Sequence, residues 1–154
     1  MLKRKSKAPD FSLRDKDEKV HKLNLIKSKY TLVYFYPKDN TPGCTIEAHQ
    51  FNQYLREFKK QEVQIIGISG GDEKSKTQFC EKNRLDLLLL SDPSFSVSKK
   101  YKVYGDKSFM GKRFMGISRI SYLLDVNKKV LKVYEKVNPF RHATDVLEDV
   151  KKLR

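Results

Sequence analysis

The sequence has little cysteine and no long apolar segment, and both scarcities restrict the class of protein. Its 154 residues include two cysteines, too few for the disulfide framework of a small secreted domain, which indicates a reducing compartment. The apolar runs of the sequence, such as Leu87 to Leu90, are far too short to cross a bilayer. The basic N-terminal residues are followed by Ala8-Pro9-Asp10 rather than by an apolar stretch, so an ordinary signal peptide is not expected. We therefore predict a soluble, cytoplasmic protein.

The sequence also lacks the motifs of metal-binding and dithiol proteins. A zinc site needs about four ligands at clustered spacing, whereas the candidate ligands Cys44, Cys80, His21, His49 and His142 are spread through the chain. A disulfide oxidoreductase of the thioredoxin type carries C-x-x-C, and no such pair occurs here. Nothing in the sequence indicates haem, flavin or a metal, so we expect neither a cofactor nor a metal ion.

Acidic residues are outnumbered by basic ones. The chain has 33 Lys and Arg against 19 Asp and Glu, a formal net charge of +14. Such an excess suits either nucleic-acid binding or a solvated, lysine-rich surface. The lysines are distributed along the whole chain, and no stretch alternates basic with aromatic residues as a single-strand binding groove does. We favour the solvated surface, expect no specific nucleic-acid or membrane binding, and keep a basic nucleic-acid-binding protein as an alternative.

What the sequence does contain is an alternation of strand and helix patterns. The run TLVYFY, Thr31 to Tyr36, is rich in β-branched and aromatic residues and indicates a strand buried on both faces. Further strands are predicted at 63–69, 85–92, 118–125 and 130–137, with a short hairpin arm formed by 11–13 and 20–25. Helices are predicted after Thr41 through 58, at 72–83 and 95–101, and from Asn138 as N-cap and Pro139 as first helical residue to 153. Residues 105–116 are predicted to form a loop.

The order of these elements predicts the fold class. Strand–helix–strand–helix–strand units are closed by a hairpin and a last helix, which indicates an α/β protein, a three-layer α/β/α sandwich with a mixed central sheet. A ββα piece after βαβ units is the layout of a thioredoxin-like fold. Since there is no internal repeat and no linker, we expect residues 1–154 to form a single domain.

One of the two cysteines stands where a helix is predicted to begin. In the stretch YFYPKDNTPGCTIEA, Thr41 suits the N-cap and Pro42 the first helical position, which puts Cys44 in the first turn. The free amide hydrogens and the positive dipole end there stabilise an anion such as a thiolate. Gly43 lets the backbone lie close to the sulfur and leaves room for a small ligand, whereas Glu47 opposes a thiolate unless a cation offsets it. We favour a reactive cysteine over the alternative of a buried structural one.

The same stretch resembles a known family. Residues 37–44, PKDNTPGC, match the P-x-x-x-T-x-x-C motif of peroxiredoxins, and Tyr34 to Ala48 as a whole resembles the bacterioferritin-comigratory, or PrxQ-type, subfamily. The resemblance continues in order along nearly the whole chain, through APDFSL, VQIIGIS, LLLLSD, GISRISYLLD and HATDVLEDVKKL. It implies a thioredoxin-like (peroxiredoxin) fold, in agreement with the order of elements, and the activity of a thiol-dependent peroxidase.

The resemblance also implies roles for individual residues. Cys44 would be the peroxidatic nucleophile, attacking hydrogen peroxide or an organic hydroperoxide as a thiolate. Thr41 and the amides of Gly43 and Cys44 would donate hydrogen bonds to the reacting oxygens. Arg119 would hold both thiolate and peroxide, and Pro37 would shield the sulfur from bulk water. Without the resemblance, Arg119 reads as a surface arginine and Pro37 as a strand terminator.

Turnover by such an enzyme requires that the sulfenic acid formed on Cys44 be resolved by a second thiol. The commonest PrxQ pattern has its resolving cysteine five residues after the nucleophile, but His49 occupies that position here, and we expect it to be solvated. Some members place the resolver on the next helix, and Cys80 fits that arrangement. The resemblance thus implies a Cys44–Cys80 disulfide, recycled by thioredoxin or a similar dithiol protein and formed after local unwinding. The alternative is a one-cysteine enzyme in which Cys80 is structural.

Two further expectations concern assembly and the mouth of the site. Monomers are common in the resembling subfamily, and a monomer is expected. The predicted loop Gly105 to Gly116 carries Phe109, Met110, Phe114 and Met115. These residues are interpreted as lining the substrate mouth, as a small satellite cluster or as a dimer contact, and the sequence does not choose among the three.

Overall fold

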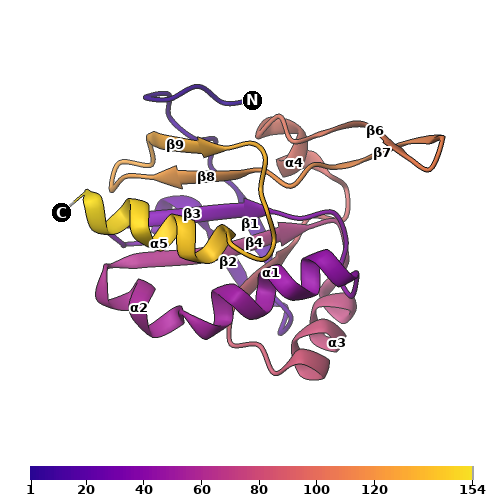
Figure 1. Ribbon diagram of the computed structural model, residues 1–154, viewed down its shortest axis with the longest axis horizontal. Helices are drawn as coiled ribbons and strands as arrows, with labels where there is room; N and C mark the ends of the chain where they lie inside the picture. The colour runs from indigo at the N-terminus through magenta and orange to yellow at the C-terminus, as the bar shows by residue number, and fades with distance from the viewer. Residues whose placement is uncertain (154) are drawn as a thin grey trace.

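A seven-stranded mixed sheet forms the centre of the computed structural model, which describes residues 1–153 and, of Phe109, the backbone alone (Figure 1). The strand order is β2-β1-β5-β4-β3-β8-β9, with β3, β4 and β5 parallel and the remaining pairs antiparallel. The strands are β1 (Ser12–Arg14), β2 (Val20–Lys22), β3 (Tyr30–Phe35), β4 (Val63–Ser69), β5 (Leu88–Ser91), β8 (Ser121–Leu124) and β9 (Val130–Tyr134). A separate hairpin, β6 (Tyr104–Phe109) and β7 (Lys112–Ile117), projects from the body.

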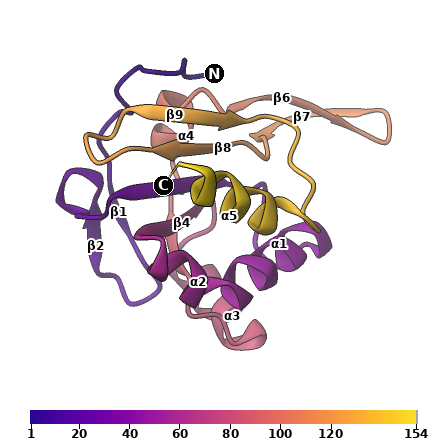
Figure 2. The ribbon, with the colours of Figure 1, turned by 60° about the vertical axis from the view of Figure 1, so that its left-hand side comes forward.

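Helices cover both faces of the sheet, so the predicted α/β sandwich with a mixed sheet is confirmed. The helices are α1 (Pro42–Gln53), α2 (Leu55–Lys60), α3 (Glu73–Asn83), α4 (Ser96–Lys100) and α5 (His142–Lys152), with a 3-10 turn at Leu23–Leu25. Side chains of α1, α2, α3 and α5 pack in one core cluster with Leu32 and Tyr34 of β3. Val33 and Phe35 of the same strand face a second cluster that includes α4 and the N-terminal segment (Figure 2). Alternate side chains of β3 thus point into two separate core clusters, one on each face of the sheet. Four helices pack against one face, and α4 packs against the other.

The register around β3 determines which segments meet at its carboxyl end. Every residue of β3 is buried, as expected of a central strand. β3 runs parallel to β4, so the helices that follow them, α1 and α3, both begin at the same edge of the sheet. β8 runs antiparallel to β3 and pairs Ser121 with Tyr34. The chain just before Ser121 therefore enters the sheet beside the loop that leads into α1.

Several predicted boundaries were wrong. The strands predicted at 118–125, 130–137 and 20–25 are shorter, Ser121–Leu124, Val130–Tyr134 and Val20–Lys22. The last helix begins at His142, with Arg141 at the N-cap position, because Asn138 closes a turn instead: its side-chain oxygen accepts from the Phe140 amide at 3.0 Å and its carbonyl from the His142 amide at 2.9 Å. The first helix is interrupted at Tyr54, whose backbone is not helical (φ −103, ψ 15), although Phe58 beyond it still packs in the same core. The third strand begins at Leu88 rather than at 85.

The segment predicted as a loop, Gly105 to Gly116, is a β-hairpin. Its two-residue connection, Met110 and Gly111, has φ of 52 and 78, the positive values that a tight hairpin turn needs. The prediction failed because both faces of the hairpin are largely exposed, so no alternation of apolar and polar residues marks the strands. Within residues 1–153, no helix has the length and apolar character needed to cross a membrane.

Candidate active site

Cys44 lies in the first turn of α1, as the sequence predicted, and its side chain is 2 % exposed. Pro42 is the first helical residue and Thr41 occupies the N-cap position with extended backbone. Because the first amides of a helix have no intrahelical acceptor, the Gly43 and Cys44 N–H groups are free to bind an incoming oxygen. The site therefore combines a nearly buried sulfur with unpaired backbone donors.

Arg119 is the cation that faces this sulfur. It lies in the link between β7 and β8, and its Nη2 is 3.5 Å from Cys44 Sγ while Nη1 donates to Glu47 Oε1 at 2.8 Å. Gly43 makes room for the guanidinium, since a Cβ there would lie 3.1 Å from Nη2. Arg119, 75 positions after Cys44 in the sequence, thus contacts both the thiol and the Glu47 carboxylate of α1.

Glu47 is fully buried one turn after Cys44, and its second oxygen, Oε2, has no hydrogen-bond partner within the described residues. Burial raises the pKa of Glu47 from 4.5 to about 7, although the Arg119 charge and hydrogen bond oppose the shift. Burial lowers the pKa of Arg119, but Glu47 and Cys44 more than offset this and keep that pKa above its usual value. The Arg119 charge is therefore shared between two potential anions, one of which titrates near neutrality.

Thr41 and Pro37 lie in the loop that precedes Cys44, and both are half-buried. The Thr41 hydroxyl donates to the Lys38 carbonyl at 2.9 Å and makes no capping bond to α1. Its lone pairs remain available as acceptors, and donation to a bound oxygen requires the hydroxyl to rotate away from Lys38. β3 ends at Phe35, Tyr36 follows it, and Pro37 is the next residue of the loop.

A second cation near the sulfur, Lys107 of β6, was missed by the sequence analysis. Its Nζ donates to the Ile117 carbonyl at 2.8 Å, two residues before Arg119. Burial and the Arg119 charge lower the pKa of Lys107, whereas Cys44 opposes the shift. The only sequence signal was a lysine in a glycine-rich stretch, because the hairpin that places it beside Arg119 was not predicted.

Cys80 lies in the second half of α3, 3 % exposed and without a bond to Cys44. Burial raises the pKa of the Cys80 thiol, opposed in part by Lys16. Residue Cys80 borders a small cavity of about 200 Å³ together with Lys16 and Asp86. His49, at the position where a cysteine is commonest in the resembling subfamily, is exposed as predicted and lies 3.2 Å from Asn83 Oδ1.

The chain is similar to known proteins in both its sequence and its fold. Residues 5–133 match the AhpC/TSA family. The chain belongs to that family. It is 40% identical over 144 residues to the peroxiredoxin Bcp of Escherichia coli, covering 94% of this chain and 92% of that protein. The predicted peroxiredoxin family is confirmed, and the chain is a thiol-dependent peroxidase.

Solved structures of AhpC/TSA relatives agree with this assignment. Xanthomonas campestris peroxiredoxin Q superposes with a TM-score of 0.86 at 34% identity, over 92% of this chain and 90% of the other. A further structure, of the bacterioferritin comigratory protein from the same organism, concerns its alkyl peroxide reduction activity (TM-score 0.86, 32% identity, 93% and 91% covered). The X. campestris peroxiredoxin Q has also been solved with either of two cysteines, 36 positions apart, replaced by serine. The predicted thioredoxin-like fold is therefore that of these peroxiredoxins.

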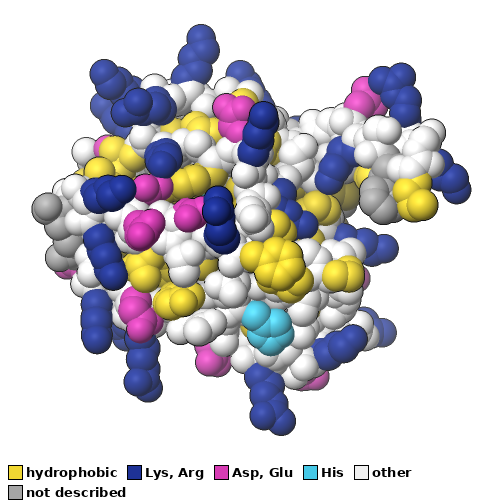
Figure 3. All heavy atoms as spheres, in the orientation of Figure 1, with side chains coloured by type: hydrophobic (Ala, Val, Ile, Leu, Met, Phe, Trp, Pro, Cys, Tyr) yellow, Lys and Arg dark blue, Asp and Glu magenta, His cyan; other side chains and the backbone are white. Residues whose placement is uncertain are grey.

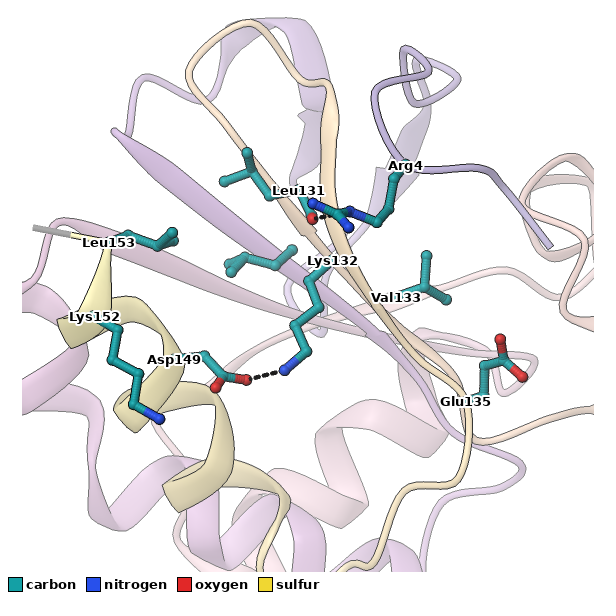
Figure 4. Close-up of a pocket in the computed structure, with 9 residues that line it drawn as sticks. Arg4, Leu131, Lys132, Val133, Glu135, Asp149, Lys152 and Leu153 are labelled. Carbon is teal, nitrogen blue, oxygen red and sulfur yellow. Dashed lines mark hydrogen bonds and ion pairs between the residues drawn. The ribbon is translucent and has the colours of Figure 1, made fainter.

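A larger cavity of about 630 Å³ lies between β9, the end of α5 and the N-terminal segment of the chain (Figure 4). Arg4 Nε donates to the Leu131 carbonyl at 3.2 Å on one side of it, and Lys132 pairs with Asp149 at 2.6 Å on the other. Neither cysteine lines it. Within residues 1–153 no cluster of three His, Cys, Asp or Glu suited to a metal occurs.

The surface of the peroxidase shows how its basic residues and the apolar residues of the β6–β7 hairpin are distributed. On the face shown in Figure 3, Lys and Arg side chains are scattered rather than gathered into one patch, the distribution that was expected of a solvated surface. On the hairpin, Met110 is 87% exposed, and Phe114 and Met115 are also exposed. These three side chains do not form a packed satellite cluster, and the side chain of Phe109 lies outside the described residues.

Proposed function

We propose that Cys44 is the nucleophile of the peroxidase reaction. Its thiolate attacks one oxygen of the peroxide, the O–O bond breaks, and the departing oxygen takes up a proton to leave as water or an alcohol. Cys44 is thereby oxidised to the sulfenic acid. The observation that carries the proposal is the 3.5 Å contact between Arg119 Nη2 and a sulfur in the first turn of α1, where two positive fields coincide.

The surrounding groups stabilise the two oxygens of the peroxide. Charge accumulates on the departing oxygen, and donors fixed around a dry site stabilise it most effectively. We assign this role to the Gly43 and Cys44 amides, to Arg119 and to the Thr41 hydroxyl. Pro37, in the loop before Cys44, contributes by shielding the sulfur from bulk water. Because Cys44 is nearly buried, we expect small hydroperoxides to react fastest, with hydrogen peroxide and short organic hydroperoxides as substrates.

Cys80 is the proposed resolving thiol. Its sulfur attacks the sulfenic sulfur of Cys44, the S–S bond forms, and the sulfenic oxygen leaves as water with the thiol proton. The spacing of the two cysteines equals that of the pair replaced in the X. campestris relative. The disulfide is then reduced by thioredoxin or a similar dithiol protein. The burial and raised pKa of Cys80 favour the one-cysteine alternative, in which an external thiol reduces Cys44.

The remaining expectations describe the setting of this reaction. We propose a monomer in which residues 1–154 act as one domain, without cofactor, in the cytoplasm. Two cysteines in 154 residues are too few for a secreted disulfide framework, which supports a reducing compartment.

The decisive experiment treats the reduced protein with one equivalent of hydrogen peroxide and measures its intact mass and free thiols. We expect the loss of two hydrogens and no free thiol in the wild type. Cys44→Ser should not react, and Cys80→Ser should gain one oxygen at Cys44. A gain of one oxygen in the wild type with Cys80 still free would instead establish the one-cysteine enzyme. A wild-type protein whose Cys44 does not react would refute the proposed nucleophile.

A further inference from the structure

The loop before Cys44 and the helix that carries Cys80 are joined by a buried ion pair. Asp39, in that loop, lies 2.9 Å from Lys76 Nζ, in the first half of α3. The Lys76 side chain is fully buried and that of Asp39 nearly so. Burying two charges is unfavourable unless they are paired and hydrogen-bonded. A pair at this position therefore requires an explanation beyond the packing of the core.

The ion pair is the centre of a larger polar network. The Asp39 carboxylate accepts from Tyr36 Oη at 2.6 Å and from Ser75 Oγ at 2.6 Å. Lys76 Nζ also donates to Ser69 Oγ at 2.6 Å and to the Gly71 carbonyl at 3.3 Å. These partners lie at the ends of β3 and β4 and at the start of α3. Asp39 thus fastens the loop to the carboxyl edge of the sheet and to α3 at once.

Both segments that the pair joins must move if the two thiols are to react. Asp39 precedes Cys44 by five residues, and Lys76 precedes Cys80 by four, one turn earlier on the same helix. Each thiol is buried in its own helix and free, and a disulfide brings its two sulfurs to bonding distance, about 2 Å. His49 of α1 lies 3.2 Å from Asn83 of α3, and both cysteines belong to one core cluster, so the two helices are neighbours (Figure 1), but each thiol is held by the intact turns of its own helix.

We propose that Asp39 and Lys76 are positioning residues that hold the Cys44 loop and the Cys80 helix in the conformation that reacts with peroxide, and that disulfide formation requires this pair to separate. The inference rests on the proposed roles of the two thiols. While the pair is closed, Cys44 keeps its place in the first turn of α1 and Cys80 stays buried. When it opens, the first turns of α3 lose their attachment to the sheet edge, and Cys80 becomes accessible to the Cys44 sulfenic acid.

The proposal is tested without peroxide, by the alkylation of Cys80 with iodoacetamide in a Cys44→Ser background. A thiol 3 % exposed reacts only when its surroundings open, so the rate reports local opening. The variant Asp39→Asn/Lys76→Met removes both charges together and leaves no unpaired buried ion. We expect its alkylation to be at least about tenfold faster than that of the parent, and nearly independent of urea below the unfolding transition, because a local opening exposes little surface.

A second test variant, Gly71→Ala, keeps both charges of the ion pair and can be measured even if the double variant does not fold. A methyl group at Gly71 would overlap the Asp39 carboxylate and lie 2.8 Å from Ser75 Oγ, so Gly71→Ala should displace Asp39 and speed alkylation severalfold. Gly105→Ala is its control, since among the described residues no atom beyond its chain neighbours lies within 4 Å of the added Cβ. Lys132→Met is the control for the ion pair, because it removes the partly exposed Lys132–Asp149 pair. Neither control should change the rate.

Two results would overturn the proposal. One is alkylation at the parental rate in both test variants. The other is a faster rate that depends on urea as steeply as global unfolding does, since that would show loss of overall stability only. The same variants with Cys44 restored are then treated with peroxide, and disulfide formation after sulfenic acid should accelerate. Failure of Cys44 to oxidise would count against the proposed function alone, because alkylation of Cys80 does not depend on it.

Discussion

The two cysteines of this peroxidase are equally buried, yet their surroundings are opposite. Cys44 is 2 % exposed and Cys80 3 %, so exposure does not distinguish them. Cys44 lies in a first helical turn with Arg119 at 3.5 Å. Cys80 lies in the second half of α3, where burial raises the pKa of its thiol and intrahelical bonds occupy the backbone amides.

The comparison teaches that the reactivity of a buried thiol depends on the charge and the free donors around it. A thiolate at Cys44 replaces lost hydration with a fixed guanidinium and unpaired amides. Burial raises the pKa of the Cys80 thiol and outweighs the charges of Lys16 and Lys76, which lower it, and within residues 1–153 neither lysine donates a hydrogen bond to this sulfur as Arg119 does to Cys44. Cys80 therefore needs a change of conformation before it reacts, whereas Cys44 is prepared in the folded state. Each prediction below alters a residue in the surroundings of Cys44, and the first uses Cys80 as the internal reference.

Replacing Arg119 should have the largest effect. Arg119→Met removes the cation that contacts Cys44 and should slow its oxidation by hydrogen peroxide about 100-fold or more. The rate is measured by quenched mixing followed by thiol counting. Arg119→Lys should recover only part of the rate, because a single ammonium cannot hold sulfur and Glu47 together as the guanidinium fork does. Alkylation of Cys80 in the Cys44→Ser background should be unchanged; a parallel change there would mean that Arg119 acts by stabilising the fold.

Thr41→Val should slow the same reaction about tenfold, the effect expected for losing one hydrogen bond to a developing charge. Valine keeps the shape of threonine, so the loop should remain folded. The loss should appear in the rate constant for Cys44 oxidation and be similar for hydrogen peroxide and a short alkyl hydroperoxide. A variant as fast as the wild type would show that the hydroxyl stays bound to Lys38 and takes no part.

Glu47→Gln should change the pH dependence of Cys44 oxidation. As pH rises through about 7, the wild type gains a negative charge on Glu47 that competes for Arg119 and opposes the thiolate. The glutamine variant lacks this charge, so its rate relative to the wild type should rise roughly threefold to tenfold between pH 6 and 8. Stopped-flow rates over this range measure the ratio. A constant ratio would contradict the titration of Glu47.

The same variant tests the pKa through stability. The pKa of Glu47 is raised from 4.5 to about 7 in the folded protein, so protonated Glu47 favours the folded state. This contribution to the free energy of unfolding is fully present below pH 4.5 and is lost as the pH rises through 7. The loss corresponds to about 3 kcal/mol in the free energy of unfolding. Glu47→Gln should not show it, so urea denaturation at pH 5 and pH 8 should favour the variant more at pH 8. An equal difference at both pH values would indicate an ordinary pKa in the folded protein.

Lys107→Met should have the smallest effect, a twofold to threefold slower oxidation of Cys44 that disappears at high salt, because a partly exposed charge is screened. Lys112→Met, an exposed lysine on the same hairpin, is the control and should leave the rate unchanged. If both variants lose the same factor, the effect comes from net charge rather than from the position of Lys107 beside Arg119.

The sequence by itself determined the order of strands and helices and the place of the nucleophile. The buried run at 31–36 and the pattern Thr41-Pro42-Gly43-Cys44 are local signals, set by side-chain size, fixed φ of proline and free amides, and each was placed within a residue or so. Local signals failed in two places. The hairpin of β6 and β7 has no buried face, so its sequence lacks an alternating pattern. Asn138 accepts a hydrogen bond within a turn and does not cap the last helix.

Only the tertiary structure decided which residues meet at the sulfur. The antiparallel pairing of β8 with β3 brings Arg119 across 75 positions of sequence to Cys44, and the hairpin brings Lys107 beside it. The parallel pairing of β3 with β4 places Asp39 against Lys76. No single stretch carries these contacts, because a salt bridge or a charge-assisted bond depends on distances between segments, and those distances are set by strand register and by the packing of both faces of the sheet.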